Sequence, residues 1–372
     1  MKHKKGVSKH QWFFWIAGII LLMIFTTACG SQSNSDGTSS SGGKKKTATI
    51  ALLLPETGTS ARYESQDKPD FEAAVKDLNP DIKVIYQNAQ GDEQTQQKQA
   101  ESAITSGAKV LVIDPQDSKA AATIVRKAQD ADVKVISYDR LILNAKEDYY
   151  ISFNNEKVGE LQGKYIADHT PKGGTVVMIN GAQSDNNALL FRKGAHTILD
   201  PLFKDKTLVK GYESYTPEWL ADNALRETEQ ALTKLDNKVD AVLAANDGNA
   251  GAAIKALKAQ GLAGKVPVTG QDATDDGLRN IVLGTQSMSV YKDVKKEATA
   301  AAQLAVALAE GKAPPKGLVN GKTNNNMTDV PSVLLDPIAV TKDNLADTVI
   351  KDGYTTWDKI CTGDAAQKCP EH

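Results

Sequence analysis

The chain has 372 residues, 24% of them charged, and a formal net charge of −2. Apart from the basic start and a short run at 44–46, Lys and Arg form no dense block, which argues against a nucleic-acid-binding protein. Residues 47–372 are enough chain for two domains with a large core.

Residues 1–28 predict a signal peptide. Four lysines within the first nine residues precede an uncharged apolar run over 12–25, which is short for a transmembrane span. The run ends at TTACG (26–30), which resembles a bacterial lipoprotein cleavage site with Cys29 as the lipidated residue. Ordinary signal cleavage beside a chance cysteine is the alternative. We therefore expect an exported protein, lipid-anchored at the outer face of the cytoplasmic membrane.

Residues 29–46 predict a flexible tether, because Ser and Gly dominate and almost no apolar side chain is available to bury. Such a segment reaches roughly 20–25 Å, so the globular body would move just above the membrane.

The remaining cysteines, Cys361 and Cys369, stand close together near the C-terminus. In an exported protein this pair predicts a disulfide. Two free thiols on a mobile tail are the alternative. A metal pair is disfavoured because no further Cys and no His cluster accompany them. We expect no metal site and no cofactor.

Short apolar runs, several of them rich in Val and Ile, predict β-strands. Strands that are apolar throughout are usually covered on both faces, as in a parallel sheet. The expected strands are 47–54, 82–86, 109–113, 133–138, 175–179, 239–244 and 266–270.

Helical patterns separate these strands. They cover 92–106, 118–130 with Ser118 as its N-cap, 155–169, and a further helix through 225–235. The repeated strand–helix order predicts an α/β fold with parallel sheets.

The strand–helix units fall into two series, which predict two similar lobes with several chain crossings. An Ala-rich helix over 298–310, a loop over 311–327 and a last strand over 333–340 follow. The expected division is an N-terminal lobe of 47–153 plus 292–332, a C-terminal lobe of 154–291 plus 333–353, and a tail of 354–372.

Short polar clusters, most of them directly after a predicted strand, mark a candidate binding site. Ligands of open α/β sheets bind at the carboxyl ends of the strands. Asp, Asn, Arg and Lys side chains exchange hydrogen bonds with hydroxyl groups, and the rings of Tyr63 and Trp219 cover C–H surface, so the set suits a sugar. Its members are Arg62, Tyr63, Asp139, Arg140, Asp185, Asn186, Asn187, Arg192, Asn246, Asp247, Asp272 and Lys292.

Several of these residues would also suit purely structural roles. Asp139 and Arg140 would also suit a surface ion pair, and Trp219 would suit a core. Asn and Asp favour helix N-caps, so we expect Asp247 to cap the helix that begins near 248 while Asn246 faces the ligand.

Several motifs resemble those of the D-xylose-binding proteins, the extracytoplasmic substrate-binding proteins of ATP-binding-cassette sugar importers. The resemblance covers nearly all of 48–353, and YDR followed by YISF-N-EKVGELQ is specific to this branch. This chain departs from it at Tyr63, where relatives carry Trp, and in its lipoprotein start and Cys-bearing tail. The motifs are VISYDR (135–140), YISFNNEKVGELQ (150–162), DNNALLFR (185–192), AAND (244–247), GQD (270–272) and GTQSMSVYK (284–292).

The resemblance implies the periplasmic binding protein type I fold, with two Rossmann-like lobes and parallel sheets joined by a three-segment hinge. It implies a monomer that closes on D-xylose and delivers it to an ABC transporter permease, with Tyr63 and Trp219 against the sugar faces. The implied pocket takes Arg62, Asp139 and Arg140 from the first lobe, Asp185, Asn187, Arg192, Trp219, Asn246 and Asp272 from the second, and Lys292 from a hinge crossing.

Three alternatives keep parts of this interpretation. The same fold would bind another monosaccharide (glucose, ribose, arabinose or galactose), or present bound sugar to a receptor as a sensor. A secreted carbohydrate-active enzyme is disfavoured because the sequence has no G-x-S-x-G elbow and no metal-binding His spacing. A two-carboxylate glycosidase using Asp139 and Asp272 is disfavoured too, because neighbouring arginines lower the pKa that a general acid needs.

Overall fold

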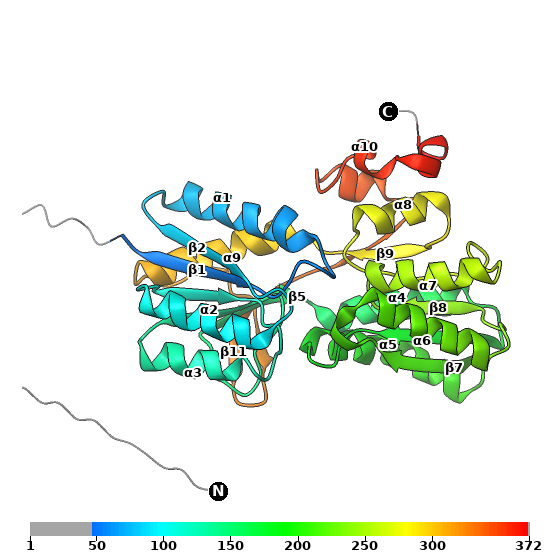
Figure 1. Cartoon of the computed structure of the whole chain (residues 1–372), viewed down its shortest axis with the longest axis horizontal. Coiled ribbons are helices and arrows are strands. Elements are labelled where there is room, and N and C mark those ends of the chain that lie inside the picture. Colours follow the sequence, from blue (N-terminus) through cyan, green and yellow to red (C-terminus); the bar gives the residue numbers. More distant parts are fainter. Residues whose placement is uncertain (1–46, 371–372) are drawn as a thin grey trace, which may run out of the picture. The chain divides into compact units, whose positions relative to one another are not determined.

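The computed structural model describes residues 47–370. The predicted signal peptide, the predicted tether and Cys29 lie outside these described residues. Within 47–370, no helix is both long enough and apolar enough to cross a bilayer. The described chain forms two lobes, each an α/β sandwich with helices on both faces of a sheet (Figure 1).

The first lobe is built on a seven-stranded sheet with the order β10-β11-β5-β4-β3-β1-β2. All neighbours are parallel except β10 and β11. The strands β1 and β3 are apolar and almost wholly buried, as expected for a sheet covered on both faces. The strands are β1 (Thr49–Leu54), β2 (Lys83–Asn88), β3 (Val110–Ile113), β4 (Lys134–Tyr138), β5 (Tyr149–Phe153), β10 (Gly321–Asn324) and β11 (Asp329–Leu335).

Two pairs of helices cover this sheet. The helices α1 (Lys68–Leu78) and α9 (Val294–Ala309) pack on one face, where Phe71 and Leu304 meet the inner side of β1. On the other face lie α2 (Glu93–Thr105) and α3 (Ala122–Asp130), with Val125 against Leu53. The helix α9 comes late in the chain but packs in the first lobe. That lobe is therefore built from segments far apart in the sequence.

The second lobe is built on the parallel strands β7-β6-β8. Isolated parallel bridges, Val242 to Val268 and Gln271 to Val290, continue the sheet toward β9, which pairs antiparallel with β12. The strands are β6 (Gly174–Asn180), β7 (Leu208–Tyr215), β8 (Ala241–Ala244), β9 (Met288–Tyr291) and β12 (Ile338–Thr341). The helices are α4 (Asn155–His169), α5 (Asn186–Lys204), α6 (Ala221–Lys234), α7 (Asp247–Ala259) and α8 (Asp275–Leu283).

The chain crosses between the lobes three times, after β5, after β9 and after β11. The expectation of one strand over 333–340 is wrong: β11 stays in the first lobe through Leu335, and β12 belongs to the second. Pro337 lies between them and has no N–H to donate to a ladder, so the strand breaks there. The third crossing thus lies at 336–337, not at 332–333 as expected.

Other local expectations also change. Residues 266–270 contribute a single bridge at Val268 where a full strand was expected. The expected helix over 118–130 begins only at Ala122, so Ser118 is not its cap. The hydroxyl of Ser118 instead accepts a hydrogen bond from the backbone N–H of Asn186 in the second lobe (3.1 Å). The partly exposed β7, which carries charges, and the short β5 and β9 were not anticipated.

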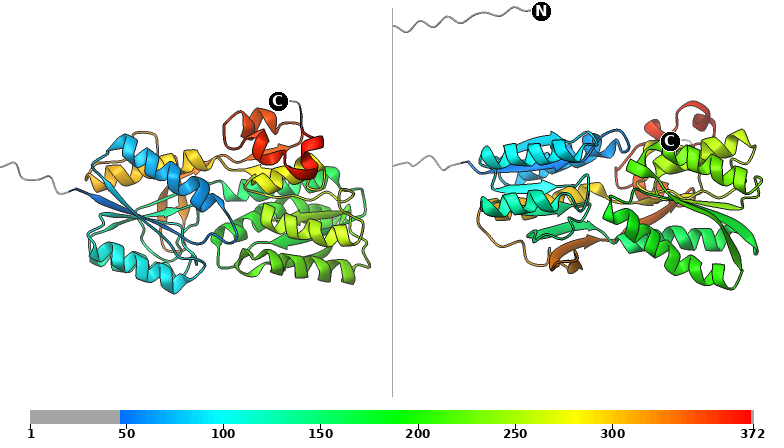
Figure 2. Two further views of the ribbon diagram at one scale, coloured as in Figure 1. Left: turned by 45° about the horizontal axis from the view of Figure 1, so that its top comes forward. Right: turned by 60° about the horizontal axis from the view of Figure 1, so that its bottom comes forward.

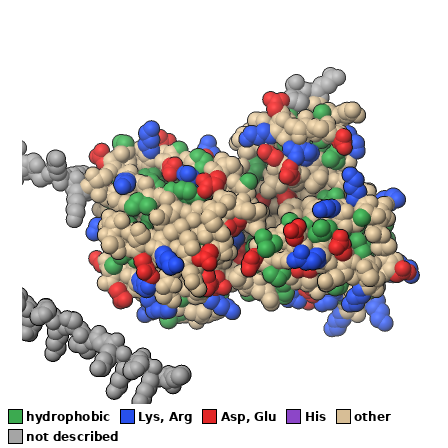
Figure 3. Space-filling view, viewed as in Figure 1, with side chains coloured by type: hydrophobic (Ala, Val, Ile, Leu, Met, Phe, Trp, Pro, Cys, Tyr) green, Lys and Arg blue, Asp and Glu red, His purple; other side chains and the backbone are tan. Residues whose placement is uncertain are grey.

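After β12 come a short helix, η3 (Ala346–Ile350), and then the tail from 354 onward, which packs on the second lobe beside α8 (Figure 2). The tail contains two short helices, α10 (Trp357–Ile360) and η4 (Gly363–Gln367), and a disulfide joins Cys361 to Cys369. Across the face drawn in Figure 3, acidic and basic side chains are interspersed.

Candidate functional site

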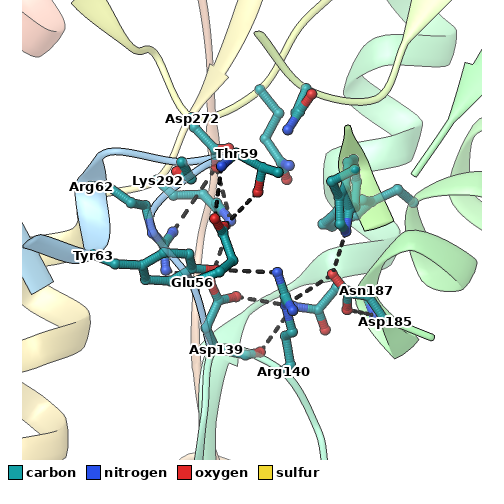
Figure 4. Close-up of a pocket in the computed structure, with 15 residues that line it drawn as sticks. Glu56, Thr59, Arg62, Tyr63, Asp139, Arg140, Asp185, Asn187, Asp272 and Lys292 are labelled. Atoms are coloured by element: carbon teal, nitrogen blue, oxygen red, sulfur yellow. Dashed lines mark hydrogen bonds and ion pairs between the residues drawn. The ribbon is translucent and has the colours of Figure 1, made fainter. Parts of the chain in front are cut away.

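A small polar cavity of about 30 Å³ lies between the two lobes (Figure 4). The lining residues are Glu56, Thr59, Ser60, Arg62, Tyr63, Asp139, Arg140, Asp185, Asn187, Phe191, Trp219, Asn246, Gln271, Asp272 and Lys292.

Strand ends place most of these side chains. Asp139 follows β4 directly, Asn246 comes two residues after β8, and Lys292 follows β9. Because parallel strands end at one edge of a sheet, each lobe turns one polar edge toward the other, and the cavity lies where these edges meet. This is the arrangement expected from the polar clusters in the sequence.

Three lining residues have left-handed backbone conformations although none is glycine. The φ angles are +55° at Asp139, +58° at Trp219 and +88° at Asp272. Such conformations cost on the order of 1–3 kcal/mol each and persist only where the surroundings enforce them. At these three positions the ion pairs of Asp139 and Asp272 and the indole hydrogen bond of Trp219 supply that enforcement.

Arg62 is the centre of the charge network on one side of the cavity. Its guanidinium contacts Asp139, lies 3.2 Å from Asp67, and lies 3.8 Å from Glu297 and 4.0 Å from Asp272. The side chain is almost wholly buried, so each of these charges is poorly screened by solvent. A cluster of this kind holds Asp139 in one orientation before any ligand enters.

Lys292 completes the same network from a hinge crossing. Its ammonium group lies 3.1 Å from Asp272 and 3.9 Å from Asp139. Burial alone would raise the pKa of Asp139, but Arg62, Lys292 and Arg140 together hold that pKa below its ordinary value. Asp139 is therefore an ionised acceptor, suited to take a hydrogen bond from a hydroxyl group.

Arg140 joins the two lobes. Its Nε lies 3.1 Å from Asp185 of the second lobe and 3.6 Å from Asp114 of the first, and Nη2 donates to the Tyr63 hydroxyl (3.3 Å). Burial raises the pKa of Asp185 despite the charge of Arg140. The interior location excludes the plainer role of a surface ion pair for Asp139 and Arg140.

Further hydrogen bonds hold the lobes together around the cavity. The Asn187 amide donates to the Asp139 carbonyl and carboxylate, both at 3.0 Å. Outside the cavity lining, the Ser118 N–H donates to the Ser184 carbonyl (3.0 Å). The described conformation is therefore one in which the lobes are closed on each other.

Aromatic rings border both sides. Tyr63 lies beside Arg62, whose guanidinium carbon is 5.1 Å from the ring centroid. Trp219 donates its indole N–H to Asp185 (3.1 Å). Gly181, just after β6, leaves room for that indole, since a Cβ there would lie 2.0 Å from the ring. Trp219 is thus packed on one side and faces the cavity with another.

The assignment of the helix cap to Asp247 is wrong. Asn246 is the N-cap of α7, and its side-chain oxygen accepts from the Asn249 N–H (2.8 Å) while the residue also lines the cavity. The carboxylate of Asp247 points the other way and accepts from Thr274, Gln286 and Ser289.

Arg192 does not line the cavity, and neither do Asn186 and Asp247 of the polar clusters. Arg192 lies on α5 one position after Phe191, and a turn of about 100° per residue carries it to the outer face. There its Nε lies 2.6 Å from Glu213 of β7. The other ten expected ligand-binding residues are brought together.

Five lining residues were missed: Glu56, Thr59, Ser60, Phe191 and Gln271. Glu56 comes just after β1, so the rule used for the other strand ends would have found it. Phe191 lies four residues after Asn187 on the same face of α5, and Gln271 stands inside the GQD motif. Within 47–370 no group of three or more Asp, Glu, His and Cys side chains is arranged to hold a metal ion.

Comparison with known proteins adds independent evidence. Residues 50–313 match a family described as "Periplasmic binding protein domain". The chain is 46% identical over 272 residues to the D-xylose-binding periplasmic protein of Escherichia coli, covering 73% of this chain and 81% of that protein. This identity confirms the resemblance inferred from the motifs.

Two further relatives are also sugar-binding proteins. A multiple sugar-binding periplasmic receptor of Rhizobium radiobacter is 35% identical, covering 84% of this chain and 92% of that protein. A carbohydrate transporter solute binding protein of Chloroflexus aurantiacus, solved in complex with D-glucose, superposes with a TM-score of 0.77 at 33% identity, covering 83% of this chain and 97% of that one.

Proposed function

We propose that this chain, which belongs to the periplasmic binding protein family and has its type I fold, binds a monosaccharide, with D-xylose favoured, between its closing lobes. The observation that carries the proposal is the cavity itself, where charged and amide side chains from both lobes converge between two aromatic rings. A polyol needs donors, acceptors and ring faces in this combination.

We assign the binding role to ten side chains, each with a chemical task. Asp139, Asp185 and Asp272 would accept hydrogen bonds from sugar hydroxyls, and Arg62, Arg140 and Lys292 would donate to sugar oxygens. Asn187 and Asn246 have both donors and acceptors. Tyr63 and Trp219 would cover the apolar faces. A sugar that contacts both lobes would favour the closed state, because it binds that state better than the open one.

Of two proteins similar to this chain, one is a D-xylose-binding protein and the other was solved with D-glucose. D-xylose is favoured because the D-xylose-binding protein has the higher sequence identity to this chain. A thermal-shift series with xylose, ribose, arabinose, glucose and galactose separates these possibilities. Saturation at about 100 times the dissociation constant adds roughly 2.7 kcal/mol, which corresponds to a shift of about 5–10 °C. A flat profile with all five sugars would refute sugar binding. A shift with glucose and none with xylose would keep the fold and reject the favoured sugar.

In this role the protein is a monomeric carrier, not an enzyme, and hands its sugar to the permease of an ATP-binding-cassette importer. The bound sugar would be released unchanged. NMR spectra of xylose incubated with the protein would show a single unaltered sugar, and any new product signal would contradict the assignment.

We further propose that Cys29 is lipidated, so that the protein is exported and retained at the outer face of the cytoplasmic membrane. The support is the basic start, the apolar run and the TTACG segment. The Cys29→Ala form should pass to the soluble exported fraction, and the wild type should partition with membranes. Equal membrane retention of both forms would reject the anchor.

A further inference from the structure

The C-terminal tail is an integral part of the second lobe. Ile360 and Ala365 are buried in a cluster with Leu278 and Ile281 of α8. The disulfide between Cys361 and Cys369 closes the segment that carries these two apolar side chains. The tail therefore forms a small packed cap on α8, where a mobile appendage was one of the expectations.

Polar contacts bind the tail to both ends of α8. The Thr355 hydroxyl bonds to Asp275 at the first residue of the helix. Arg279 donates to the backbone carbonyls of Lys359 (2.9 Å) and Ile360 (3.2 Å). Lys368 donates to the carbonyl of Leu283 at the last residue (2.9 Å). A shift of the tail would consequently move α8 and the loop that precedes it.

That loop carries Asp272, and the first residue of the tail contacts it directly. The Tyr354 hydroxyl donates to the backbone carbonyl of Asp272 at 2.7 Å. Asp272 and Ala273 both have positive φ angles, +88° and +49°. A conformation that unfavourable needs external support, and the Tyr354 hydroxyl bonds to the peptide unit inside this strained pair.

Tyr354 also touches the other residues around Asp272. Its ring packs edge-to-face on Tyr291 with centroids 4.8 Å apart, and Tyr291 directly precedes Lys292, the 3.1 Å partner of Asp272. From the first lobe, the Gln66 amide reaches the Tyr354 carbonyl (3.4 Å). Tyr354 thus contacts the backbone of Asp272 and the neighbour of Lys292. In the closed conformation it also contacts Gln66 of the opposite lobe.

A groove of about 1020 Å³ lies on the far side of Arg62 from the sugar cavity, and Tyr354 forms part of its wall. Figure 3 shows a hollow there, between the first lobe and the tail. Tyr354 therefore faces this groove and does not line the sugar cavity. Any effect of Tyr354 on the site is exerted through the residues that it contacts.

We propose that Tyr354 is a positioning residue for the sugar site and that the disulfide-closed tail is the support that keeps it in place. The inference rests on the proposed sugar binding. The hydroxyl holds the Asp272 peptide so that the carboxylate meets Lys292 and faces the cavity. Loss of this support lets the loop relax, and the sugar then meets a carboxylate that is not preorganised.

The first experiment is calorimetric titration of D-xylose into the full chain carrying Tyr354→Phe. Phenylalanine keeps the ring packing on Tyr291 and removes only the hydroxyl. We expect the dissociation constant to rise threefold to tenfold. The matched control is Tyr212→Phe, which removes a hydroxyl bonded to Gln230 on the outer side of the second lobe and should leave xylose binding unchanged.

A second measurement separates positioning from general destabilisation. If Tyr354 acts through Asp272, Tyr354→Phe should add no further loss in the Asp272→Ala background. Equal losses in both backgrounds would mean that the tyrosine merely supports the lobe, and would overturn the proposal. So would a Tyr354→Phe affinity equal to that of the wild type.

The role of the disulfide is tested by the double variant Cys361→Ser/Cys369→Ser. We expect weaker xylose binding, by twofold to fivefold, and the same weakening when the wild type is reduced. Reduction should not weaken the double variant further. Unchanged affinity would remove the disulfide from the proposal. Failure of the wild type to bind any sugar would instead refute the proposed function, so the two failures are distinguishable.

Discussion

The two halves of the cavity are built from different chemistry. The first lobe contributes Arg62, Asp139 and Arg140, with the buried carboxyl groups of Asp67, Asp114 and Glu297 behind them. The second lobe contributes mainly amides and rings, namely Asn187, Asn246, Gln271, Phe191 and Trp219. Its two carboxylates, Asp185 and Asp272, find their nearest cations in Arg140 and Lys292. The first half is thus held by charge, and Asp185 of the second half takes its cation, Arg140, from the first lobe.

Charge balance around the whole cavity has a further consequence. Arg62, Arg140 and Lys292 provide fewer positive charges than the surrounding carboxyl groups would provide negative ones. Burial accordingly raises the pKa of four of these groups, while the nearby cations lower that of Asp139. The four are Asp67, Asp114, Asp185 and Glu297. These four groups are therefore easier to protonate than ordinary carboxylates, whereas the cations favour the ionised form of Asp139.

The largest effect on stability should come from Asp247, the acceptor at the centre of the hydrogen bonds behind the second lobe's half of the cavity. Asp247→Ala removes the acceptor for Gln286 (2.7 Å), Ser289 (2.8 Å) and the Thr274 N–H (2.8 Å). Buried donors left unpaired cost about 1–3 kcal/mol each, so we expect at least about 3 kcal/mol lower stability. Urea unfolding would measure this loss.

The matched control for Asp247→Ala is the exposed Asp222 of α6, whose replacement by Ala should be nearly neutral. Affinity of the folded Asp247→Ala protein for xylose should change less than its stability. A large loss of affinity with little loss of stability would mean that Asp247 is a ligand-binding group. The second half would then also bind the sugar through a charged group behind its amides and rings.

The next effect concerns the charges that face the sugar. Arg140→Ala and Asp272→Ala should each weaken xylose binding by roughly tenfold or more, because hydrogen bonds to charged groups contribute about 1.5–3 kcal/mol. Calorimetry measures this directly, and Arg126→Ala on the exposed surface of the first lobe is the control. Near-native affinity in both cavity variants would place the site elsewhere.

A smaller effect concerns Glu147, a buried carboxyl group of the first lobe that forms no ion pair among the described residues. Burial raises the pKa of Glu147 to about 7, although Asn325 and Ser137 donate hydrogen bonds to it. Because the folded-state pKa lies above the unfolded value of about 4.3, the folded protein holds an extra proton between these values. The stability that Glu147 contributes is therefore lost as pH rises from about 4.5 to 7.

Glu147→Gln should remove this pH dependence, because the amide resembles the protonated acid. Relative to wild type, the variant should gain about 1–2 kcal/mol at pH 8 and little at pH 4.5, measured by urea unfolding at both values. Glu229→Gln on the exposed side of α6 is the control. A gain of equal size at both pH values would exclude titration of Glu147 as its cause.

Strand-end chemistry made much of the site predictable. Asp139, Asn246 and Lys292 could be found because each comes just after a short apolar strand, and parallel strands share their carboxyl edge. Arg192 failed because it lies inside a helix, where one residue changes the face. The bond from Tyr354 to the Asp272 carbonyl had no sequence signal, since a backbone acceptor is common to every residue. Only the packing of the tail on α8 brings these two together.

The smallest effect should come from Trp219, where the two chemistries meet. Its indole N–H donates to Asp185, which lies 3.1 Å from Arg140 of the first lobe, so the ring orients the partner of a cation across the cavity. Trp219→Phe keeps an aromatic face and removes that donor. A net hydrogen bond of about 0.5–1.5 kcal/mol corresponds to a loss of xylose affinity of roughly two- to twelvefold.

The change should depend on Arg140 if this interpretation is correct. In the Arg140→Ala background, the orientation of Asp185 matters less, so Trp219→Phe should cost less than it does alone. Double-mutant cycles by calorimetry measure this coupling. Strictly additive losses would mean that Trp219 serves only as a surface for the sugar ring. The halves of the cavity would then act independently, and closure would join them without an energetic link through Asp185.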